Sequence, residues 1–298
     1  MAEGVQAPDS PGHFATRAAP AKINLSLRVT GRRDDGYHEL NGLIAFAAVG
    51  DRVTVEAAPG TSLTLTGPFA ETLRGEGDNL VLRAAHRLAE SWHRPGGAAI
   101  TLDKQLPVAA GIGGGSADAA AALQALRVVW DLPVREADLA RLALDLGADV
   151  PICLHGRPAF VTGIGERISP APALPPAWLV LVNPGVPLST ADVFRARPRE
   201  VSPPAPPWTG APPDAATLAA WLAEDRNDLE PTARRLVPEI DAVLTALRER
   251  PDCRLQRMSG SGATCFGLFA EAESAEHAAA HLAETHPAWW VRAGRLLS

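Results

Sequence analysis

The chain has few cysteines, and their arrangement suits neither a disulfide framework nor a metal site. Cys153, Cys253 and Cys265 are odd in number and follow no spacing that is typical of metal ligands. Small secreted domains, in contrast, are usually rich in paired cysteines. The cysteine pattern therefore favours a protein of the reducing cytoplasm.

Long apolar runs and clusters of basic residues are also missing from the sequence. No run approaches the roughly 20 apolar residues of a membrane span, and the N-terminus lacks the charged-then-apolar pattern of a signal peptide. The net charge is −6, and Lys22 and Lys104 are the only lysines. A general nucleic-acid binder would carry a basic patch. We therefore expect a partner that is neither a membrane nor a nucleic acid.

What the chain does have is the composition of a globular protein. Its 298 residues, of which 46% are apolar and 21% charged, suffice for two modest domains or one large one. Residues 1–17 are polar, small and proline-containing, so we expect a flexible tail there. Residues 198–213 contain seven prolines and predict an irregular excursion, to which we assign no chemistry.

A glycine-rich loop lies between an expected strand and an expected helix. The alternating residues 99–102 predict the strand, and an alanine-rich run that ends near Trp130 predicts the helix. Four glycines within residues 111–115 allow backbone N–H groups to approach a ligand closely. A helix N-terminus adds unpaired N–H groups and a positive dipole end. The combination favours a phosphate site, and a simple glycine-rich turn is the alternative.

Two common phosphate-binding motifs are excluded by the residues themselves. A P-loop needs a lysine after its glycines, and none follows here. The dinucleotide fingerprint needs a third glycine where this chain has Ser116. The acidic residue that should follow a strand in that motif, Asp131, lies instead at an expected helix end.

The region before this loop combines a polar strand face with an aromatic corner. Residues 18–29 alternate as a strand does, which places Lys22 and Asn24 on the same polar face. A solvated strand surface is the simpler interpretation of that face. The following turn presents Tyr37, the only tyrosine, beside His38. This pair either belongs to a hairpin turn without a binding role or forms a corner that stacks on a nucleobase.

Local patterns predict most of the other elements. A turn at Gly50 and Asp51 should separate two strands, and Asp78 should cap a helix that runs to residue 92. Asp149 is placed to cap a short helix with Pro151 in its first turn. Further strands are expected at 62–66, 159–162, 177–182, 253–258 and 264–269, and helices at 136–146, 215–225 and 228–249.

Several blocks of the chain, in consistent order, resemble the GHMP kinases, a superfamily that includes galactokinase, homoserine kinase and mevalonate kinase. The blocks are residues 20–38, 78–80, 107–118, 147–151, 183–194 and 259–263. The resemblance implies an α/β (α+β) fold of two domains with the active site in the cleft between them. A ribosomal-S5-like, ATP-binding domain would cover residues 18–175, and a ferredoxin-like, substrate-binding domain residues 176–298.

The resemblance also implies roles for individual residues. Asp149 would be the catalytic base, and Lys22 would hold it ionised. ATP would be bound by Asn79 and by residues of the glycine-rich loop, namely Pro107, Gly111, Ile112, Gly113, Gly114, Gly115, Ser116 and Ala117. The other substrate would contact Asn24, Tyr37, His38, Thr190 and Phe194, with its base between Tyr37 and Phe194. Mg²⁺ would accompany ATP, and no residue is assigned to it as a ligand.

The Tyr37–His38 corner and the triple glycine most resemble the branch that acts on a cytidine-diphosphate-linked methylerythritol. That resemblance implies ATP-dependent phosphorylation of the substrate's 2-hydroxyl in isoprenoid precursor biosynthesis, by a cytoplasmic monomer or weak homodimer. A mevalonate, homoserine or sugar kinase is one alternative, although such substrates carry no base to stack. A ligand-binding homologue without activity is another, which the presence of both Lys22 and Asp149 disfavours. His277 and His281 share a helix face but lack a third ligand, so we expect a solvated surface there.

Overall fold

The computed structural model describes residues 14–75, 78–94 and 96–298. Most of the expected tail, residues 1–13, lies outside the described residues. The expectation is wrong for residues 14–17, because strand β1 (Phe14–Arg32) already begins at Phe14. The alternate side chains Ala15 and Ala19 are fully buried against the neighbouring strand, so this segment belongs to the sheet.

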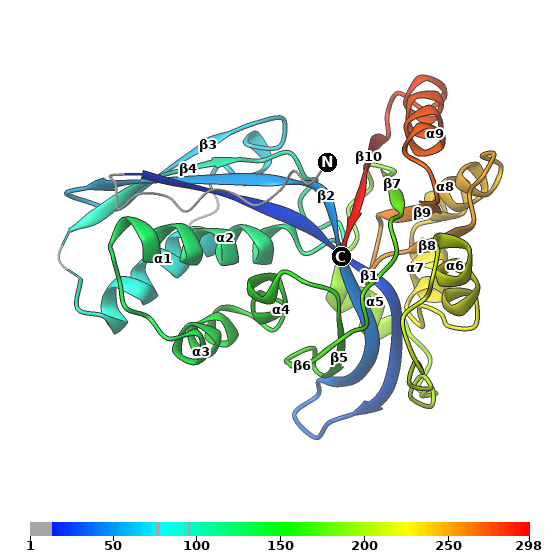
Figure 1. The fold of residues 1–298 in the computed structure, drawn as a ribbon, viewed down its shortest axis with the longest axis horizontal. Coiled ribbons are helices and arrows are strands. Elements are labelled where there is room, and N and C mark those ends of the chain that lie inside the picture. Colours follow the sequence, from blue (N-terminus) through cyan, green and yellow to red (C-terminus); the bar gives the residue numbers. More distant parts are fainter. Residues whose placement is uncertain (1–13, 76–77, 95) are drawn as a thin grey trace.

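The first half of the chain is a sheet built around strand β2 (His38–Ala58), which is antiparallel to β1 along its length. Beyond β1, it pairs with β4 (Gly97–Asp103) near one end and with β5 (Ala159–Gly163) near the other. Strand β3 (Ser62–Thr66) runs parallel to β4, and β6 (Arg167–Pro170) pairs with β5. As Figure 1 shows, β1 and β2 extend from this half toward the second half.

The turn expected at Gly50 and Asp51 is wrong, since β2 continues through both residues. A side chain at Gly50 would lie 2.3 Å from the carbonyl oxygen of Ala19, so only glycine permits this close approach. The pairing of β1 with β2 shifts register at this point. Glycine and aspartate here mark an irregularity inside a strand. A turn has the same two residue types, so the sequence alone does not separate the two cases.

The helices of the first half cover one face of this sheet (Figure 1). They are η1 (Glu71–Leu73), α1 (Leu80–Ser91), α2 (Gly114–Val129), α3 (Glu136–Leu146) and α4 (Val150–His155). The central helix is α2, whose alanines at 117, 119–122 and 125 are buried against β1, β2 and α1. Small side chains let the helix lie close to the sheet, which fixes the position of its N-terminus.

The second half is a four-stranded antiparallel sheet, with most of its helices on one face and the helix at 215–223 on the other. Its strands are β7 (Trp178–Asn183), β8 (Leu255–Met258), β9 (Cys265–Phe269) and β10 (Trp290–Leu297). Its helices are α5 (Thr190–Ala196), α6 (Ala215–Ala223), α7 (Glu230–Leu236), α8 (Glu239–Arg248) and α9 (Ala272–Thr285). The strand order β10-β7-β9-β8 and the βαββαβ succession define a ferredoxin-like unit.

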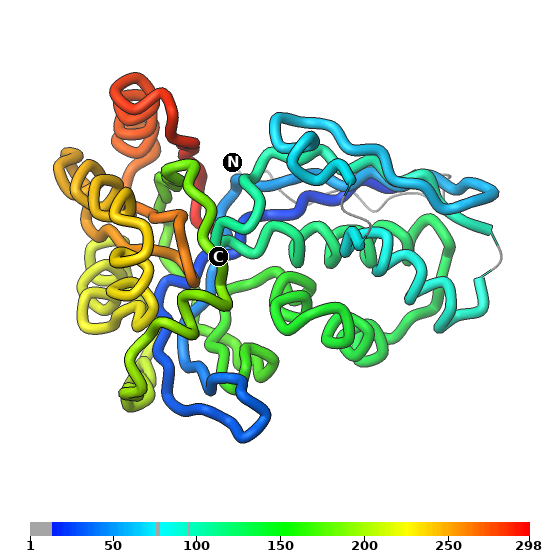
Figure 2. Tube along the Cα trace, turned by 180° about the vertical axis from the view of Figure 1, so that it is seen from behind, coloured from blue at the N-terminus to red at the C-terminus, as the bar shows by residue number. Residues whose placement is uncertain are grey.

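The two halves meet where the end of β10 pairs with β2. Figure 2 shows the junction from behind, with β1 and β2 passing between the two lobes. The proline-rich residues 198–213 contain no helix or strand, as expected. Across the described part of the chain, no helix combines the length and the apolar character that crossing a bilayer requires.

Candidate active site

The glycine-rich loop leads into α2 with its backbone exposed to a cavity. Gly113 is the N-cap residue, and the first hydrogen bond of the helix joins the N–H of Ala117 to the carbonyl of Gly113. Gly114, Gly115 and Ser116 therefore form the first turn, where N–H groups have no partner inside a helix. These three residues line a cavity of about 490 Å³. Ala117 and Ile112 are buried and lie outside that lining.

The loop is held from behind by residues 259–263 of the second half. Ser259 Oγ donates a hydrogen bond to the carbonyl of Gly111 at 3.1 Å and accepts the N–H of Asn24 at 3.0 Å. Gly111 has a φ of +75°, and a side chain there would lie within 2.7 Å of the backbone of Gly262. The segment thus packs directly on the glycine-rich loop and fixes its conformation.

Lys22 and Asp149, which are 127 residues apart in sequence, form an ion pair in the same cavity. The distance from Lys22 Nζ to Asp149 Oδ2 is 2.7 Å. The Lys22 side chain is 7% exposed, whereas that of Asp149 is 43% exposed. Asp149 occupies the N-cap position of α4, but its side chain makes no capping bond. Its carboxylate therefore faces the cavity, and the buried ammonium holds it in place.

Two further predicted residues line this cavity. Asn24 is buried, and its Oδ1 atom has no hydrogen-bond partner among the described residues. Thr190 Oγ1 lies 2.7 Å from Ser261 Oγ, so the second half contributes a hydroxyl pair. An unsatisfied buried acceptor is costly unless a ligand or water completes it. The cavity is thus suited to a ligand that carries hydroxyl groups.

A smaller adjoining cavity of about 220 Å³ contains Asn79 and Pro107 together with Gly114 and Gly115. Asn79 is the N-cap of α1, and its Oδ1 accepts the N–H of Val81 at 2.9 Å. The expectation that Asp78 caps this helix is therefore wrong by one residue. Both residue types cap helices well, so the sequence alone does not separate them.

A buried charge network beneath the loop was not predicted from the sequence. Lys104 Nζ donates to Asp51 Oδ2 and to Asp118 Oδ2, both at 2.6 Å, and all three side chains are at most 3% exposed. Burial alone would lower the pKa of Lys104, but the two carboxylates outweigh it and raise that pKa. Burial, reinforced by the charge of Asp51 and opposed by Lys104, raises the pKa of Asp118 to about 8. The one signal was that Lys104 is one of two lysines in the chain.

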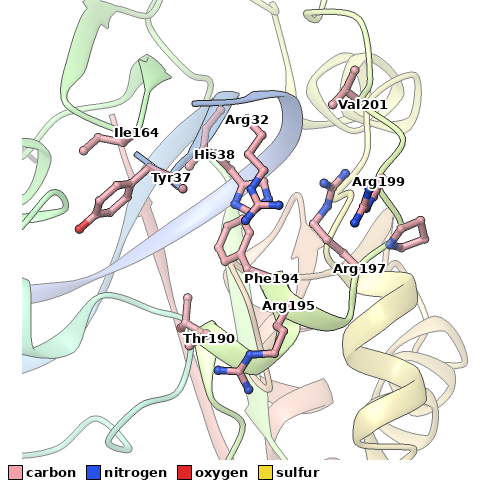
Figure 3. Close-up of a pocket in the computed structure, with 14 residues that line it drawn as sticks. Arg32, Tyr37, His38, Ile164, Thr190, Phe194, Arg195, Arg197, Arg199 and Val201 are labelled. Carbon is pink, nitrogen blue, oxygen red and sulfur yellow. The ribbon is translucent and has the colours of Figure 1, made fainter. Parts of the chain in front are cut away.

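The aromatic corner lines the largest of the three cavities, about 940 Å³. In Figure 3, His38 stacks on Phe194, with ring centroids 4.8 Å apart and planes at 26°. Tyr37 is 60% exposed at the rim, so His38 and not Tyr37 contacts Phe194. Burial, followed by the nearby charges of Arg197 and Arg32, lowers the pKa of His38. The imidazole is therefore neutral at pH 7 and keeps one acceptor nitrogen.

Four arginines of this cavity were also missed by the sequence reasoning, namely Arg32, Arg195, Arg197 and Arg199. Arg197 lies at the end of α5, and Arg199 lies within residues 198–213, for which the sequence indicated only an irregular segment. The cavity shares Leu40, Ile164, Thr190 and Phe194 with the one that contains Lys22 and Asp149. The two cavities are thus neighbouring parts of one binding region.

The structure also places the two histidines that share a helix face, His277 and His281. His277 and His281 are both exposed on α9. No cluster of three or more histidine, cysteine, aspartate or glutamate residues that could hold a metal ion occurs within residues 14–75, 78–94 and 96–298. The structure thus supplies no third ligand for this pair.

A glycine loop at a helix N-terminus, a lysine–aspartate pair and a ferredoxin-like second half together define a GHMP kinase. Family models agree: the GHMP kinases N terminal domain matches residues 79–157, and the GHMP kinases C terminal model matches residues 211–288. A 4-diphosphocytidyl-2-C-methyl-D-erythritol kinase of Paramagnetospirillum magneticum is 54% identical over 280 residues, 94% of this chain and 98% of that protein. The chain belongs to the 4-diphosphocytidyl-2-C-methyl-D-erythritol kinase family.

Solved structures give the same result. A crystal structure of a 4-(cytidine 5'-diphospho)-2C-methyl-D-erythritol kinase is 40% identical with a TM-score of 0.78, and the match covers 95% of this chain and all of that one. A homoserine kinase from Cytophaga hutchinsonii has a TM-score of 0.70 at 19% identity, over 98% of this chain and 97% of its own. The second similarity concerns the fold alone. The expected two-domain GHMP fold is confirmed, whereas the domain boundaries at 18–175 and 176–298 stay predictions.

Proposed function

We propose that this chain transfers the γ-phosphoryl group of ATP to the 2-hydroxyl of 4-diphosphocytidyl-2-C-methyl-D-erythritol, giving the 2-phosphate and ADP. The reaction belongs to the methylerythritol phosphate route to isoprenoid precursors. The observation that carries the proposal is the Lys22–Asp149 pair, because it lies in the same cavity as the first turn of α2. A base and a phosphate site that share one cavity suit phosphoryl transfer to an alcohol.

ATP fits the two smaller cavities. The N–H groups of Gly114, Gly115 and Ser116 and the positive end of α2 would bind the polyphosphate. The nucleoside would occupy the neighbouring cavity beside Asn79 and Pro107. Mg²⁺ would accompany ATP and neutralise part of the phosphate charge, and Ser116, in the first turn of α2, would offer its hydroxyl to the phosphate or to the metal.

The alcohol would be activated by Asp149. Its carboxylate is positioned to accept the proton of the 2-hydroxyl, and a positioned general base contributes roughly 10²–10⁴-fold to the rate. Lys22 orients this carboxylate and offers positive charge to the phosphoryl oxygens as the bond forms. Asn24 Oδ1, which lacks a partner, would accept a hydrogen bond from a substrate hydroxyl, and Thr190 would supply a further contact.

The larger cavity would hold the cytidine diphosphate moiety. Phe194, His38 and Tyr37 offer aromatic surface to a base, although the predicted stacking between Tyr37 and Phe194 would require a shift of His38. Homoserine and mevalonate would leave this cavity empty, because those alcohols carry no nucleobase. We therefore expect selectivity for the cytidine-linked alcohol.

The test is ADP release from ATP and Mg²⁺ with 4-diphosphocytidyl-2-C-methyl-D-erythritol, mevalonate and homoserine in parallel. The parent chain should turn over only the first substrate, and Asp149→Asn should lose roughly 10²–10⁴-fold in kcat. Asp145→Asn changes an exposed carboxylate on α3 and serves as the matched control with parent-like activity. Turnover of another alcohol would contradict the assignment, and ATP binding without any turnover would favour a non-catalytic homologue.

A further inference from the structure

The proline-rich segment forms one wall of the largest cavity. Residues 198–213 continue directly from the C-cap of α5, and three of their first four residues, Pro198, Arg199 and Val201, line that cavity. Figure 3 shows Arg199 and Val201 on this wall, beyond the ring of Phe194. All three wall residues are exposed and belong to no helix or strand. Contacts outside the cavity must therefore hold the wall in place.

The next part of the segment has two backbone donors, and both are used. Residues 202–207 contain four prolines, which have no N–H, so Ser202 and Ala205 carry the only backbone donors there. The N–H of Ser202 donates to the carbonyl oxygen of Val29 on β1, and the N–H of Ala205 donates to Oδ1 of Asn41 on β2, both at 2.9 Å. Prolines also restrict the free segment, so less conformational entropy is lost when it docks. The segment is thus fixed across the two longest strands.

Trp208 fixes the following end of the segment between the two halves of the molecule. Its ring meets Phe160 of β5 edge-on, with centroids 5.7 Å apart, and Trp221 of α6, with centroids 5.1 Å apart. Such aromatic pairs stabilise beyond the area that they bury. Arg28 adds a further contact, because its Nη1 donates to the carbonyl oxygen of Pro203 at 3.1 Å. The segment is therefore anchored on both halves.

We propose that residues 202–208 are a strap that holds the wall at 198–201 in position for the alcohol substrate, with Asn41 and Trp208 as its positioning residues. The proposal rests on the proposed function, which places the cytidine end of the alcohol in this cavity. Asn41 and Trp208 are not among the residues that line the cavity, so they act through the strap. When the strap is undocked, the substrate has to order the wall on binding. The apparent affinity then falls with the fraction of molecules in which the strap is docked.

Steady-state kinetics of the full chain with ATP and 4-diphosphocytidyl-2-C-methyl-D-erythritol test the proposal. Trp208→Ala should raise the KM of the alcohol at least about 10-fold, because most molecules would then hold the strap undocked. Asn41→Ala removes one hydrogen bond and should raise it about 3- to 10-fold. The value of kcat and the KM of ATP should stay near those of the parent, since the reacting groups are untouched. Trp208→Phe keeps an aromatic ring and Asn41→Asp keeps the acceptor oxygen, so both should recover most of the affinity.

The matched control is Trp289→Ala, which removes a half-buried tryptophan that stacks on His286 with ring centroids 3.8 Å apart. It should keep the KM of the parent even where it lowers stability. Limited trypsin digestion gives a second readout, because the exposed Arg199 lies just before the strap. Cleavage after Arg199 should be faster in Trp208→Ala and Asn41→Ala than in the parent and in the control.

The outcomes separate the strap from the proposed function. A parent-like KM for the alcohol in both Trp208→Ala and Asn41→Ala would overturn the strap, and so would an equal rise in Trp289→Ala, which would indicate a general loss of stability. If the parent turns over no cytidine-linked alcohol, the proposed function fails. The strap is then judged by trypsin alone, and unchanged cleavage after Arg199 in both variants overturns it too.

Discussion

Asp118 should make the stability of this protein fall as the pH rises from about 4 to about 8. Its pKa is raised to about 8, mainly by burial, so the folded chain holds a proton that the unfolded chain releases near pH 4. The stabilisation from that proton is complete below the unfolded pKa and is lost as the pH rises through about 8. The substitution Asp118→Asn removes the titration while preserving the size of the side chain and its acceptor for Lys104.

The magnitude follows from the two pKa values. Between them, each pH unit changes the free energy of unfolding by about 1.4 kcal/mol. From pH 6 to pH 9 the parent should therefore lose about 2 to 3 kcal/mol from this group alone. The asparagine variant should lack that component. Relative to the parent it should be more stable by about 3 kcal/mol at pH 6 and by about 5 kcal/mol at pH 9, and the two should converge only near pH 4.

Urea unfolding of both proteins at pH 6 and pH 9 measures this difference, because all other titrating groups are common to them. The control is Asp138→Asn, whose carboxylate is hydrogen-bonded to Arg135, a bond that lowers the pKa of Asp138. That group stays ionised over this range, so its variant should keep the pH dependence of the parent. Parallel stability curves for the parent and Asp118→Asn would refute the reasoning.

Two further predictions concern the support of the phosphate loop. Lys104→Met should reduce the free energy of unfolding by about 3 to 5 kcal/mol, because Asp51 would be buried without its cation and Asp118 without its hydrogen-bond donor; a loss below about 1 kcal/mol in urea titrations would contradict the pairing of Lys104 with an ionised Asp51. Gly111→Ala should weaken ATP binding at least about 10-fold, since its φ of +75° and its contact with Gly262 force the loop to shift. Parent-like ATP affinity in a calorimetric titration would show that the loop tolerates the side chain.

Much of the fold could be predicted where a local residue pattern is typical of a single kind of element. The helix expected at 136–146 and the strand expected at 159–162 correspond to α3 and β5. The failure at Gly50 has a physical cause, because close backbone approach and turn formation both require glycine. No strand was predicted at 290–297, since β10 alternates poorly between buried and exposed positions.

The candidate site was less accessible to residue-by-residue reasoning. Lys22 and Asp149 had plausible structural roles, and only the family resemblance paired them before the structure placed them 2.7 Å apart. Apart from the rarity of lysine in the chain, nothing in the sequence pointed to Lys104 and Asp118, because the sequence does not distinguish a buried charged residue from a solvated one. Arg197 and Arg199 were missed for a similar reason, as one precedes and the other lies within a proline-rich segment whose composition indicates only irregular structure.

The polar face of β1 shows why alternation misleads at a junction between domains. Alternation of apolar and polar residues usually marks a strand with one solvated face, but here Lys22, Asn24, Ser26 and Arg28 are all buried. Each of three has a protein partner: Lys22 contacts Asp149, Ser26 Oγ accepts the N–H of Leu43, and Arg28 contacts Asp225. Asn24 Oδ1 alone has none among the described residues. Because burying an unpaired acceptor costs free energy, Asn24 Oδ1 is the atom of this face that the fold leaves uncompensated, which supports the proposed hydrogen bond to a substrate hydroxyl.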